Sequence, residues 1–242
     1  MIKRVFDIIF SLLGLIITMP LLIPVCILIW LQDFSSPFYI APRVGKDGKI
    51  FKMIKLRSMT VNADRVGVDS TSANDPRITA IGKFIRSYKL DELSQLWNVL
   101  KGDMSLVGPR PNVPRAVAVY TELEKGLLKV KPGITDLASI VFSDEGEILQ
   151  DSQDPDFDYN QVIRPWKSRL GLLYVETNSL ALDIKLIFIT GIAIISRETA
   201  LSGVQKLLSE LGADDQLKHV ARRQEKLMPF LPPGAKAIIW YR

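Results

Sequence analysis

The sequence predicts an α-rich α+β fold, in which an N-terminal membrane helix precedes a small domain with a β-hairpin and several helices. An uncharged run of 25 residues lies between Asp7 and Asp33. A tight-turn signal at Asp47-Gly48 separates two extended segments, and later segments repeat apolar residues with helical spacing. We therefore expect a membrane helix over residues 1–36, one domain over 37–200 and a C-terminal extension over 201–242.

The uncharged run is long enough to cross a bilayer, because a helix of this length spans about 37 Å against a hydrocarbon core of about 30 Å. Cations follow on both sides, at Lys3, Arg4 and Arg43, and such residues favour the cytoplasmic face. Pro20 and Pro24 each remove a backbone donor, so we expect a re-entrant helix that breaks there and returns. A kinked single span is the alternative. The length of the run argues against a cleaved signal peptide.

Charge and residue usage narrow the chemistry. The formal net charge is +5, and a basic segment after the uncharged run suits anionic lipid or a phosphorylated substrate. No nucleic-acid-binding motif accompanies this charge, so we expect no nucleic-acid partner. With Cys26 and His219 as the single cysteine and histidine, disulfides, His-dependent nucleophiles and His-liganded zinc are excluded within this chain. The basic segment contains Arg43, Lys46, Lys49, Lys52, Lys55, Arg57 and Arg65.

Local patterns predict the other elements. Residues 38–59 should form two extended segments around the turn at Asp47-Gly48. In residues 90–102, Leu93, Leu96, Trp97 and Leu100 share one helical face, and Gly102 marks the helix end. The prolines of residues 102–111 predict a loop, and residues 131–135 predict a turn. Further helices are expected at 78–88, 113–128 and 179–198, the last one in the core or at the membrane interface.

An acidic stretch over residues 144–158 invites comparison with a calcium-binding loop. Counted from Asp154, position six would be Tyr159 instead of glycine, and position twelve would be Pro165 instead of glutamate. The sequence therefore favours an ordinary acidic segment over a calcium site.

Asp91 and Glu92 fall on the first turn of the predicted helix at 90–102. Carboxylates are favourable there because of the free N–H groups and the helix dipole, so a capping role is the simplest interpretation. Several basic residues surround the pair, and this setting favours a phosphate receptor in which the carboxylates hold magnesium. These basic residues are Arg77, Lys83, Arg86, Lys89 and Arg110.

Four segments of the sequence resemble motifs of the bacterial sugar transferase family. This family comprises the monotopic polyprenol-phosphate phosphoglycosyl transferases. The four segments are KLRSM at 55–59, DPRIT at 75–79, LDELSQLWNVLKGDMSLVGPRP at 90–111 and KPGIT at 131–135. The resemblance begins in the N-terminal KRVFDIIFSLLGLIITMPLLIP and reaches about residue 197. It implies an enzyme on the cytoplasmic face of the bacterial inner membrane, with a re-entrant membrane helix broken at Pro20 and Pro24.

The resemblance also implies a reaction. A sugar 1-phosphate would pass from a nucleotide sugar, typically a UDP-sugar, to undecaprenyl phosphate with release of UMP and a requirement for Mg²⁺. Asp91 would be the nucleophile and Glu92 would support metal or proton handling, with both carboxylates as metal ligands. The implied substrate-binding residues are Lys55, Arg57, Arg77, Arg86, Arg110 and Pro111.

The chain departs from the family pattern at Ser94, Asp136 and Gly171. Two other functions remain open at this point. The lipid phosphate could attack the donor directly without a covalent intermediate, or the chain could be a noncatalytic adaptor bound to membrane lipid. The tail from residue 201 could dock on the domain, on the bilayer or on a second copy in a homo-oligomer.

Overall fold

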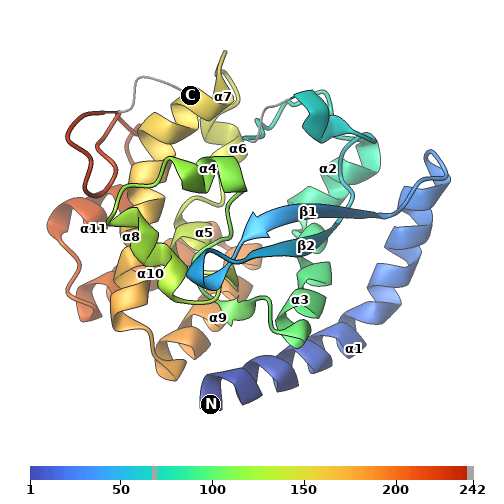
Figure 1. The fold of residues 1–242 in the computed structure, drawn as a ribbon, viewed down its shortest axis with the longest axis horizontal. Coiled ribbons are helices and arrows are strands. Elements are labelled where there is room, and N and C mark those ends of the chain that lie inside the picture. The colour runs from blue at the N-terminus through green and yellow to red at the C-terminus, as the bar shows by residue number, and fades with distance from the viewer. Residues whose placement is uncertain (67–69, 239–242) are drawn as a thin grey trace.

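A computed structural model describes residues 1–66 and 70–238. Its first element is the 30-residue helix α1 (Ile2–Leu31), which curves along one side of the remaining chain (Figure 1). Among the described residues, this is the one helix long and apolar enough to cross a membrane. Most of its large apolar side chains are exposed, as expected for contact with lipid. The helix continues through Pro20 and Pro24, so the re-entrant path stays a prediction.

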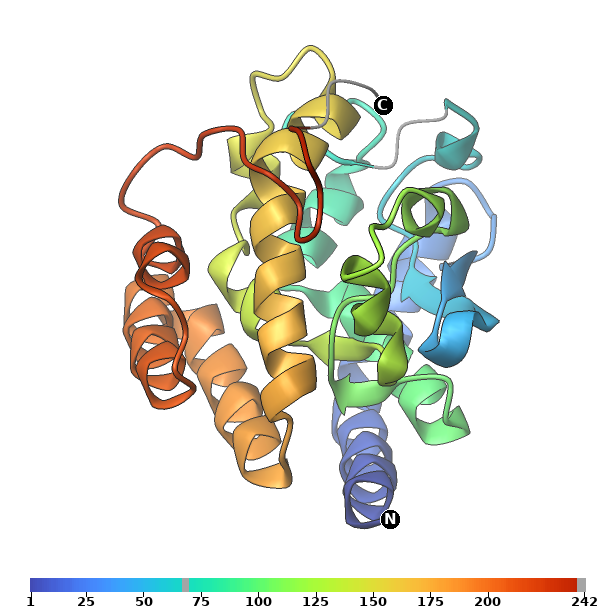
Figure 2. The same cartoon turned by 60° about the vertical axis from the view of Figure 1, so that its left-hand side comes forward.

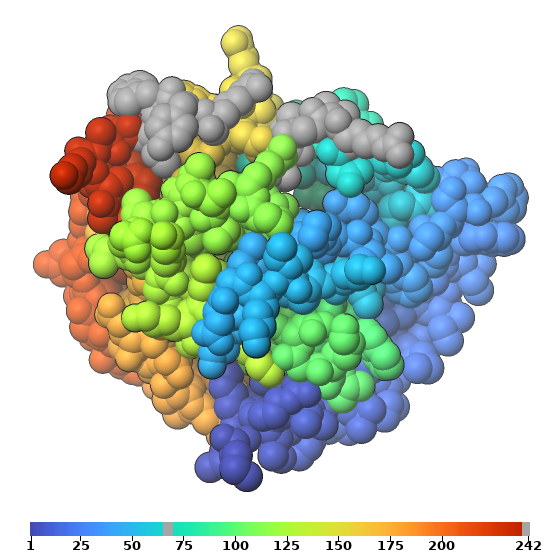
Figure 3. All heavy atoms as spheres, in the orientation of Figure 1, coloured from blue at the N-terminus to red at the C-terminus, as the bar shows by residue number. Residues whose placement is uncertain are grey.

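The predicted hairpin is confirmed. Strand β1 (Phe38–Val44) pairs antiparallel with β2 (Ile50–Leu56) in a register from Phe38↔Leu56 to Val44↔Ile50. At the turn Asp47 and Gly48 have φ values of 57° and 76°, which is the left-handed geometry that Asp-Gly favours. In the space-filling view the hairpin lies across the front of the molecule (Figure 3).

The helices predicted at 78–88 and 90–102 are both present in modified form. Helix α2 (Ala80–Ser87) begins where the Thr79 hydroxyl accepts a hydrogen bond from the Gly82 amide at 2.9 Å. Residues 90–102 split into a 3₁₀ helix, η3 (Leu90–Gln95), and α3 (Leu96–Lys101), which ends at Gly102 with φ 97°. Trp97, expected on the buried face, is half exposed.

Two of the predicted irregular segments each contribute one strand to a short parallel sheet. Strand β3 (Ser105–Val107) pairs with β4 (Gly133–Thr135), so a loop at 102–111 and a turn at 131–135 were incomplete predictions. The pairing joins segments far apart in sequence, which local pattern cannot reveal. Asp7 of α1 accepts hydrogen bonds from the Ser105 hydroxyl and the Leu106 amide at 3.1 and 3.0 Å. Helix α1 is thereby anchored to this sheet.

The single helix predicted at 113–128 was wrong. The chain forms α4 (Pro114–Ala118) and then a 3₁₀ helix, η4 (Glu124–Lys129). The Thr121 hydroxyl accepts from the Glu124 amide and the Glu124 carboxylate accepts from the Thr121 amide, at 3.1 and 3.0 Å. This reciprocal pair of hydrogen bonds, as in a capping box, lies between α4 and η4 and separates the two.

Helices form most of the C-terminal half, around one hydrophobic core that also includes Val107 of β3. Trp166, Leu170 and Tyr174 contribute from one side of α8, and Val204 and Leu208 contribute from α10. Helix α10 thus crosses the expected domain boundary after residue 200 and packs in the same core. The elements are α5 (Leu137–Val141), α6 (Glu145–Ile148), α7 (Pro155–Asp158), the π-helix η5 (Tyr159–Ile163), α8 (Arg164–Thr177), α9 (Leu180–Ile195), α10 (Arg197–Glu210) and α11 (Asp215–Ala221).

The predicted helix at 179–198 corresponds to α9, which has one buried and one exposed apolar face. Leu186 is fully buried, whereas Phe188 is 71% exposed. The Lys3 ammonium pairs with Asp183 near the start of α9, so this helix lies beside the N-terminal end of α1 (Figure 2). The buried face confirms the predicted place in the core, and a place at the membrane interface stays a prediction.

The segment after α11 packs on the domain. The Phe230 ring stacks on Trp166 of α8, with ring centroids 4.4 Å apart. The Phe230 backbone amide donates to the Gln161 carbonyl at 3.0 Å, and the Thr121 hydroxyl donates to the Pro233 carbonyl. The described part of the tail therefore ties η5 to the segment before η4.

Candidate active site

The carboxylate pair Asp91 and Glu92 lies at the start of η3, as predicted. Lys89 has a left-handed backbone with φ 54°, which turns the chain from α2 into η3. The buried Ser94 hydroxyl lies 3.2 Å from the carbonyl oxygen of Ile54 in β2. This contact holds η3 against the hairpin and brings the carboxylates next to β2.

Two cations from distant segments flank the pair. The Lys55 Nζ atom of β2 lies 3.6 Å from Asp91 Oδ2, and Arg110 Nη2 lies 2.6 Å from Glu92 Oε1. The Asp91 and Glu92 side chains are 14% and 21% exposed. The Asp91 oxygen is thus close to a cation without a short hydrogen bond to it. Such a carboxylate can rearrange toward a ligand at low cost.

The charges in this cluster shift one another's protonation. Burial, followed by the charge of Arg110, lowers the pKa of Lys55. Burial alone would raise the pKa of Glu92, but Arg110 and Lys55 outweigh it and hold that pKa below its usual range. The Glu92 charge raises the pKa of Arg110. Glu92 and Arg110 are therefore both ionised at neutral pH.

Arg110 is positioned by the close approach of two glycines, Gly108 just after β3 and Gly133 at the start of β4. The Gly108 amide donates to the Thr135 carbonyl at 3.0 Å and the Gly133 amide donates to the Pro109 carbonyl at 3.1 Å. A Cβ on Gly108 would lie 2.4 Å from a backbone oxygen, and one on Gly133 would lie 2.1 Å from the Gly108 nitrogen. Only glycine permits this approach. It sets the direction of the proline-flanked segment that carries Arg110.

Two other predicted substrate-binding residues, Arg86 and Pro111, lie near this cluster. Arg86 adds a weaker contribution, after burial and Arg110, to the lowered pKa of Lys55, so it lies near the site. Pro111 lines a shallow depression with Arg110. Lys89, which the sequence placed in the basic neighbourhood, has a pKa lowered by burial and then by the Arg110 charge.

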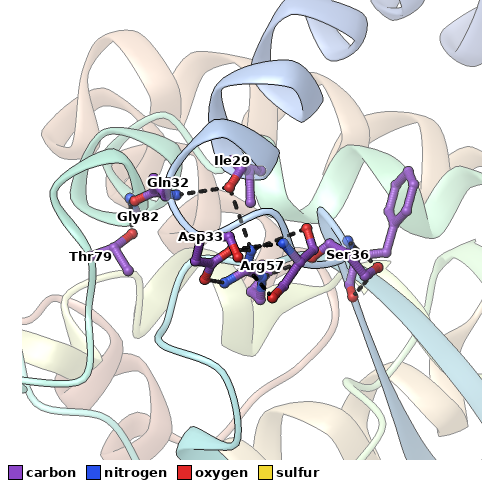
Figure 4. A network of polar contacts seen from close by, with 9 residues as sticks. Ile29, Gln32, Asp33, Ser36, Arg57, Thr79 and Gly82 are labelled. Atoms are coloured by element: carbon purple, nitrogen blue, oxygen red, sulfur yellow. Dashed lines mark hydrogen bonds and ion pairs between the residues drawn. The ribbon is translucent and has the colours of Figure 1, made fainter.

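Arg57 and Arg77 are occupied by contacts to other parts of the protein. The buried Arg57 guanidinium donates to both carboxylate oxygens of Asp33 at 2.5 and 2.7 Å and to the Ser36 carbonyl at 2.8 Å (Figure 4). It joins the end of α1 to the end of β2. Arg77 donates from Nη2 to Asp75 at 2.6 Å and from Nη1 to a backbone carbonyl at 3.0 Å. Their substrate-binding role stays a prediction, since the structure does not bring them into contact with the carboxylate pair.

A polar pocket opens beside Arg110, and most of its lining was not singled out by sequence. Arg110 was predicted to bind substrate, and Asp136 was noted as a departure from the family pattern. The others come from separate segments that no single motif links. The lining includes Pro109, Arg110, Asn112, Ala116, Tyr120, Leu127, Asp136, Ala138, Ser139, Tyr159, Asn160, Arg164, Lys167 and Ser168.

Few side chains at this site could bind magnesium. Within residues 1–66 and 70–238 there is no group of three or more His, Cys, Asp or Glu side chains that could hold a metal ion. Mg²⁺ commonly uses one or two carboxylates together with water and substrate phosphates. Asp91 and Glu92, both partly exposed, fit that pattern. In the acidic stretch, Asp154 caps α7 and Asp156 accepts from the Ser70 amide.

The fold and the site define a protein with one apolar anchoring helix and a carboxylate pair held between cations, a combination suited to phosphate chemistry at a membrane. A profile of the bacterial sugar transferase family matches residues 1–197. The chain belongs to this family.

Several relatives of this chain carry undecaprenyl phosphate in their names. An undecaprenyl-phosphate galactose phosphotransferase of Salmonella typhimurium is 37% identical over 216 residues, 82% of this chain and 41% of the relative. A UDP-glucose:undecaprenyl-phosphate glucose-1-phosphate transferase of Klebsiella pneumoniae is 39% identical over 192 residues, 78% of this chain and 39% of the relative. A Bacillus subtilis protein, provisionally named an undecaprenyl-phosphate N-acetylgalactosaminyl 1-phosphate transferase, is 51% identical over 121 residues, 50% of this chain and 65% of the relative. The chain thus spans less than two thirds of each relative.

Proposed function

We propose that this protein transfers a sugar 1-phosphate from a UDP-sugar to undecaprenyl phosphate and releases UMP. The observation that carries the proposal is the Asp91–Glu92 pair held between Lys55 and Arg110. The relatives' names support the lipid acceptor, and one of them supports a UDP-sugar donor. Such a reaction would begin the assembly of a surface glycan or polysaccharide.

In the first step, an Asp91 carboxylate oxygen attacks the sugar-proximal phosphorus of the donor. A bond forms between this oxygen and phosphorus while the bond from phosphorus to the bridging oxygen breaks, and UMP leaves with that electron pair. In the second step, a phosphate oxygen of undecaprenyl phosphate attacks the same phosphorus and frees the Asp91 carboxylate. Both steps balance without a histidine or cysteine.

The cations make this attack feasible, because an anionic nucleophile must approach an anionic diphosphate. The Arg110 guanidinium offers a planar fork to phosphate oxygens, and Lys55 adds a point charge on the Asp91 side. Glu92 holds Arg110 at 2.6 Å and orients it. When bound, Mg²⁺ would be held by Asp91 and Glu92 and would offset the diphosphate charge.

We further propose that both ends of α1 face the cytoplasm. The cations near each end and the two prolines support this, and the Arg57–Asp33 contact ties the end of α1 to the hairpin. Cysteines placed at residues 3 and 45 in a Cys26→Ser background should both be shielded from an impermeant reagent outside the cell. Labelling of the first site alone would identify a spanning helix.

The covalent intermediate provides the decisive test. Wild type mixed with a UDP-sugar and Mg²⁺, without lipid acceptor, should release UMP in an amount equal to the enzyme. Trypsin should then yield the peptide LDELSQLWNVLK (residues 90–101) with the mass of a sugar phosphate on Asp91. Turnover without this adduct in rapid-quench samples would favour direct attack by the lipid phosphate. Absence of UMP release with any UDP-sugar and acceptor would favour an adaptor.

A further inference from the structure

We propose that the pocket beside Arg110 is the subsite for the sugar ring of the donor, with Asp136 accepting a hydrogen bond from a sugar hydroxyl or acetamido N–H. The inference rests on the proposed function. It assigns a ligand class to residues that the carboxylate-pair chemistry does not use.

The position of the pocket carries the first step. Arg110 contacts Glu92 at 2.6 Å and also lines the pocket. A diphosphate bound by Arg110 next to the carboxylate pair can therefore direct one of its two substituents into the pocket, either the sugar or the nucleoside.

Asp136 carries the second step. Its side chain is buried, at 2% exposure, and its Oδ1 accepts from the Ser139 amide and hydroxyl at 2.7 and 2.6 Å. Its Oδ2 accepts no hydrogen bond from the part of the chain that the structure describes, and no cation there lies within ion-pairing distance. Because Asp136 lines the pocket, this oxygen can accept a hydrogen bond from water or from a ligand there. Burial raises the pKa of Asp136, and the hydrogen bonds from Ser139 and the nearby charges of Lys167 and Arg110 offset only part of that rise.

The chemistry of the walls favours a sugar over a uracil base. The edge of uracil presents one N–H between two carbonyl oxygens, so a carboxylate matches only its central position. Sugar hydroxyls can donate at every position of the ring. Asn112, Asn160 and Tyr120 contribute polar groups to the walls. The Asn160 amide is engaged with Asp156 and Arg164, whereas the Tyr120 hydroxyl accepts from Asn112 and keeps its own proton to donate. The rings of Tyr120 and Tyr159 each have a cation over one face, Arg164 at 5.5 Å and Lys167 at 5.4 Å, which leaves at most one face of each ring for stacking.

The walls are also held rigidly. Arg164 donates to the buried Glu124 at 2.6 and 3.0 Å and to the Val119 carbonyl at 2.7 Å. The Asn112 amide donates to the Tyr120 hydroxyl at 2.6 Å. Because these contacts cross between segments, the polar groups keep fixed positions, which is what discrimination among sugar epimers needs.

The test is Asp136→Asn, because Asn retains the cap on Ser139 while removing the charge of the free oxygen. We expect the KM of the preferred UDP-sugar to rise at least tenfold and the ranking within a panel of four to change. The panel contains the UDP derivatives of glucose, galactose, N-acetylglucosamine and N-acetylgalactosamine. The affinity for UDP alone, measured by calorimetry, should stay within twofold.

Asp214→Asn is the matched control, since Asp214 caps α11 through the Leu217 amide at 2.8 Å and lies outside the pocket lining. It should change neither KM nor ranking. If Asp136→Asn unfolds, Asp136→Ser tests the same oxygen with another capping residue. Equal loss of affinity for UDP and UDP-sugar would assign the pocket to the nucleoside, and unchanged KM and ranking would reduce Asp136 to a cap. Failure of wild type to release UMP would instead reject the proposed function.

Discussion

Two clusters in this protein each pair carboxylates with cations. They differ in how many of the carboxylate oxygens accept hydrogen bonds. Around Glu124, both carboxylate oxygens accept from Arg164, and Ser168 and the Thr121 amide add further hydrogen bonds. Glu124 is fully buried. Around Asp91 and Glu92, the side chains are partly exposed and the Lys55 contact measures 3.6 Å.

The difference separates structural charge from chemical charge. A buried carboxylate with every oxygen satisfied has no free position for a ligand and serves to fix the surrounding segments. A partly exposed carboxylate with a distant cation retains the freedom to bind phosphate or metal. A substitution in the Asp91–Glu92 cluster should therefore change activity. A substitution in the Glu124 cluster should change stability.

The largest expected effect is on catalysis at Asp91. Asp91→Asn preserves shape but removes the nucleophile, so kcat should fall on the order of 10⁴-fold, about 5 kcal/mol in activation free energy. UMP release and UDP-sugar binding are the measurements, and binding and the melting temperature should be retained. Full activity of this variant would reject the nucleophile assignment.

The next effect is on stability at Glu124. Glu124→Gln leaves Arg164 buried without its counter-charge and should lower the free energy of unfolding by about 3–5 kcal/mol. Denaturant unfolding in detergent would measure it. Glu122→Gln is the matched control, because Glu122 is 88% exposed and its loss should cost less than about 0.5 kcal/mol. Similar stability of the two variants would contradict the contrast between the clusters.

Arg110→Lys tests whether guanidinium geometry matters at the site. Lysine keeps the charge but loses the fork, so we expect kcat/KM to fall about 10- to 100-fold, or roughly 1.4–2.7 kcal/mol. Arg115→Lys, at an exposed position on α4, should leave kcat/KM unchanged. Near-normal turnover of the folded Arg110→Lys protein would show that charge alone suffices there.

The smallest effect concerns Arg57, which sequence similarity assigns to substrate binding and the structure surrounds with protein acceptors. Arg57→Lys cannot reproduce the two contacts to Asp33 and should lower stability by about 1 kcal/mol. The KM for the donor should change less than twofold. A large rise in KM with unchanged stability would return Arg57 to the substrate site.

Local pattern was sufficient where the determining interaction is near in sequence. The hairpin follows from the Asp47-Gly48 turn, and the end of α3 follows from Gly102, whose φ of 97° suits a residue without a Cβ. Pattern failed at residues 113–128, where the Thr121–Glu124 capping box divides the predicted helix. It also failed at β3 and β4, because a three-residue strand is recognisable only from its partner.

The sequence by itself determined the long apolar N-terminal helix, the hairpin and the carboxylate pair at a helix start, because each depends on composition or spacing within one segment. The tertiary structure alone decided which cations meet that pair. Lys55 and Arg110 approach it, whereas Arg57 and Arg77 are taken up by Asp33 and Asp75. Long cationic side chains have many acceptors within reach, and the packing of the hairpin, η3 and the β3–β4 pair selects among them.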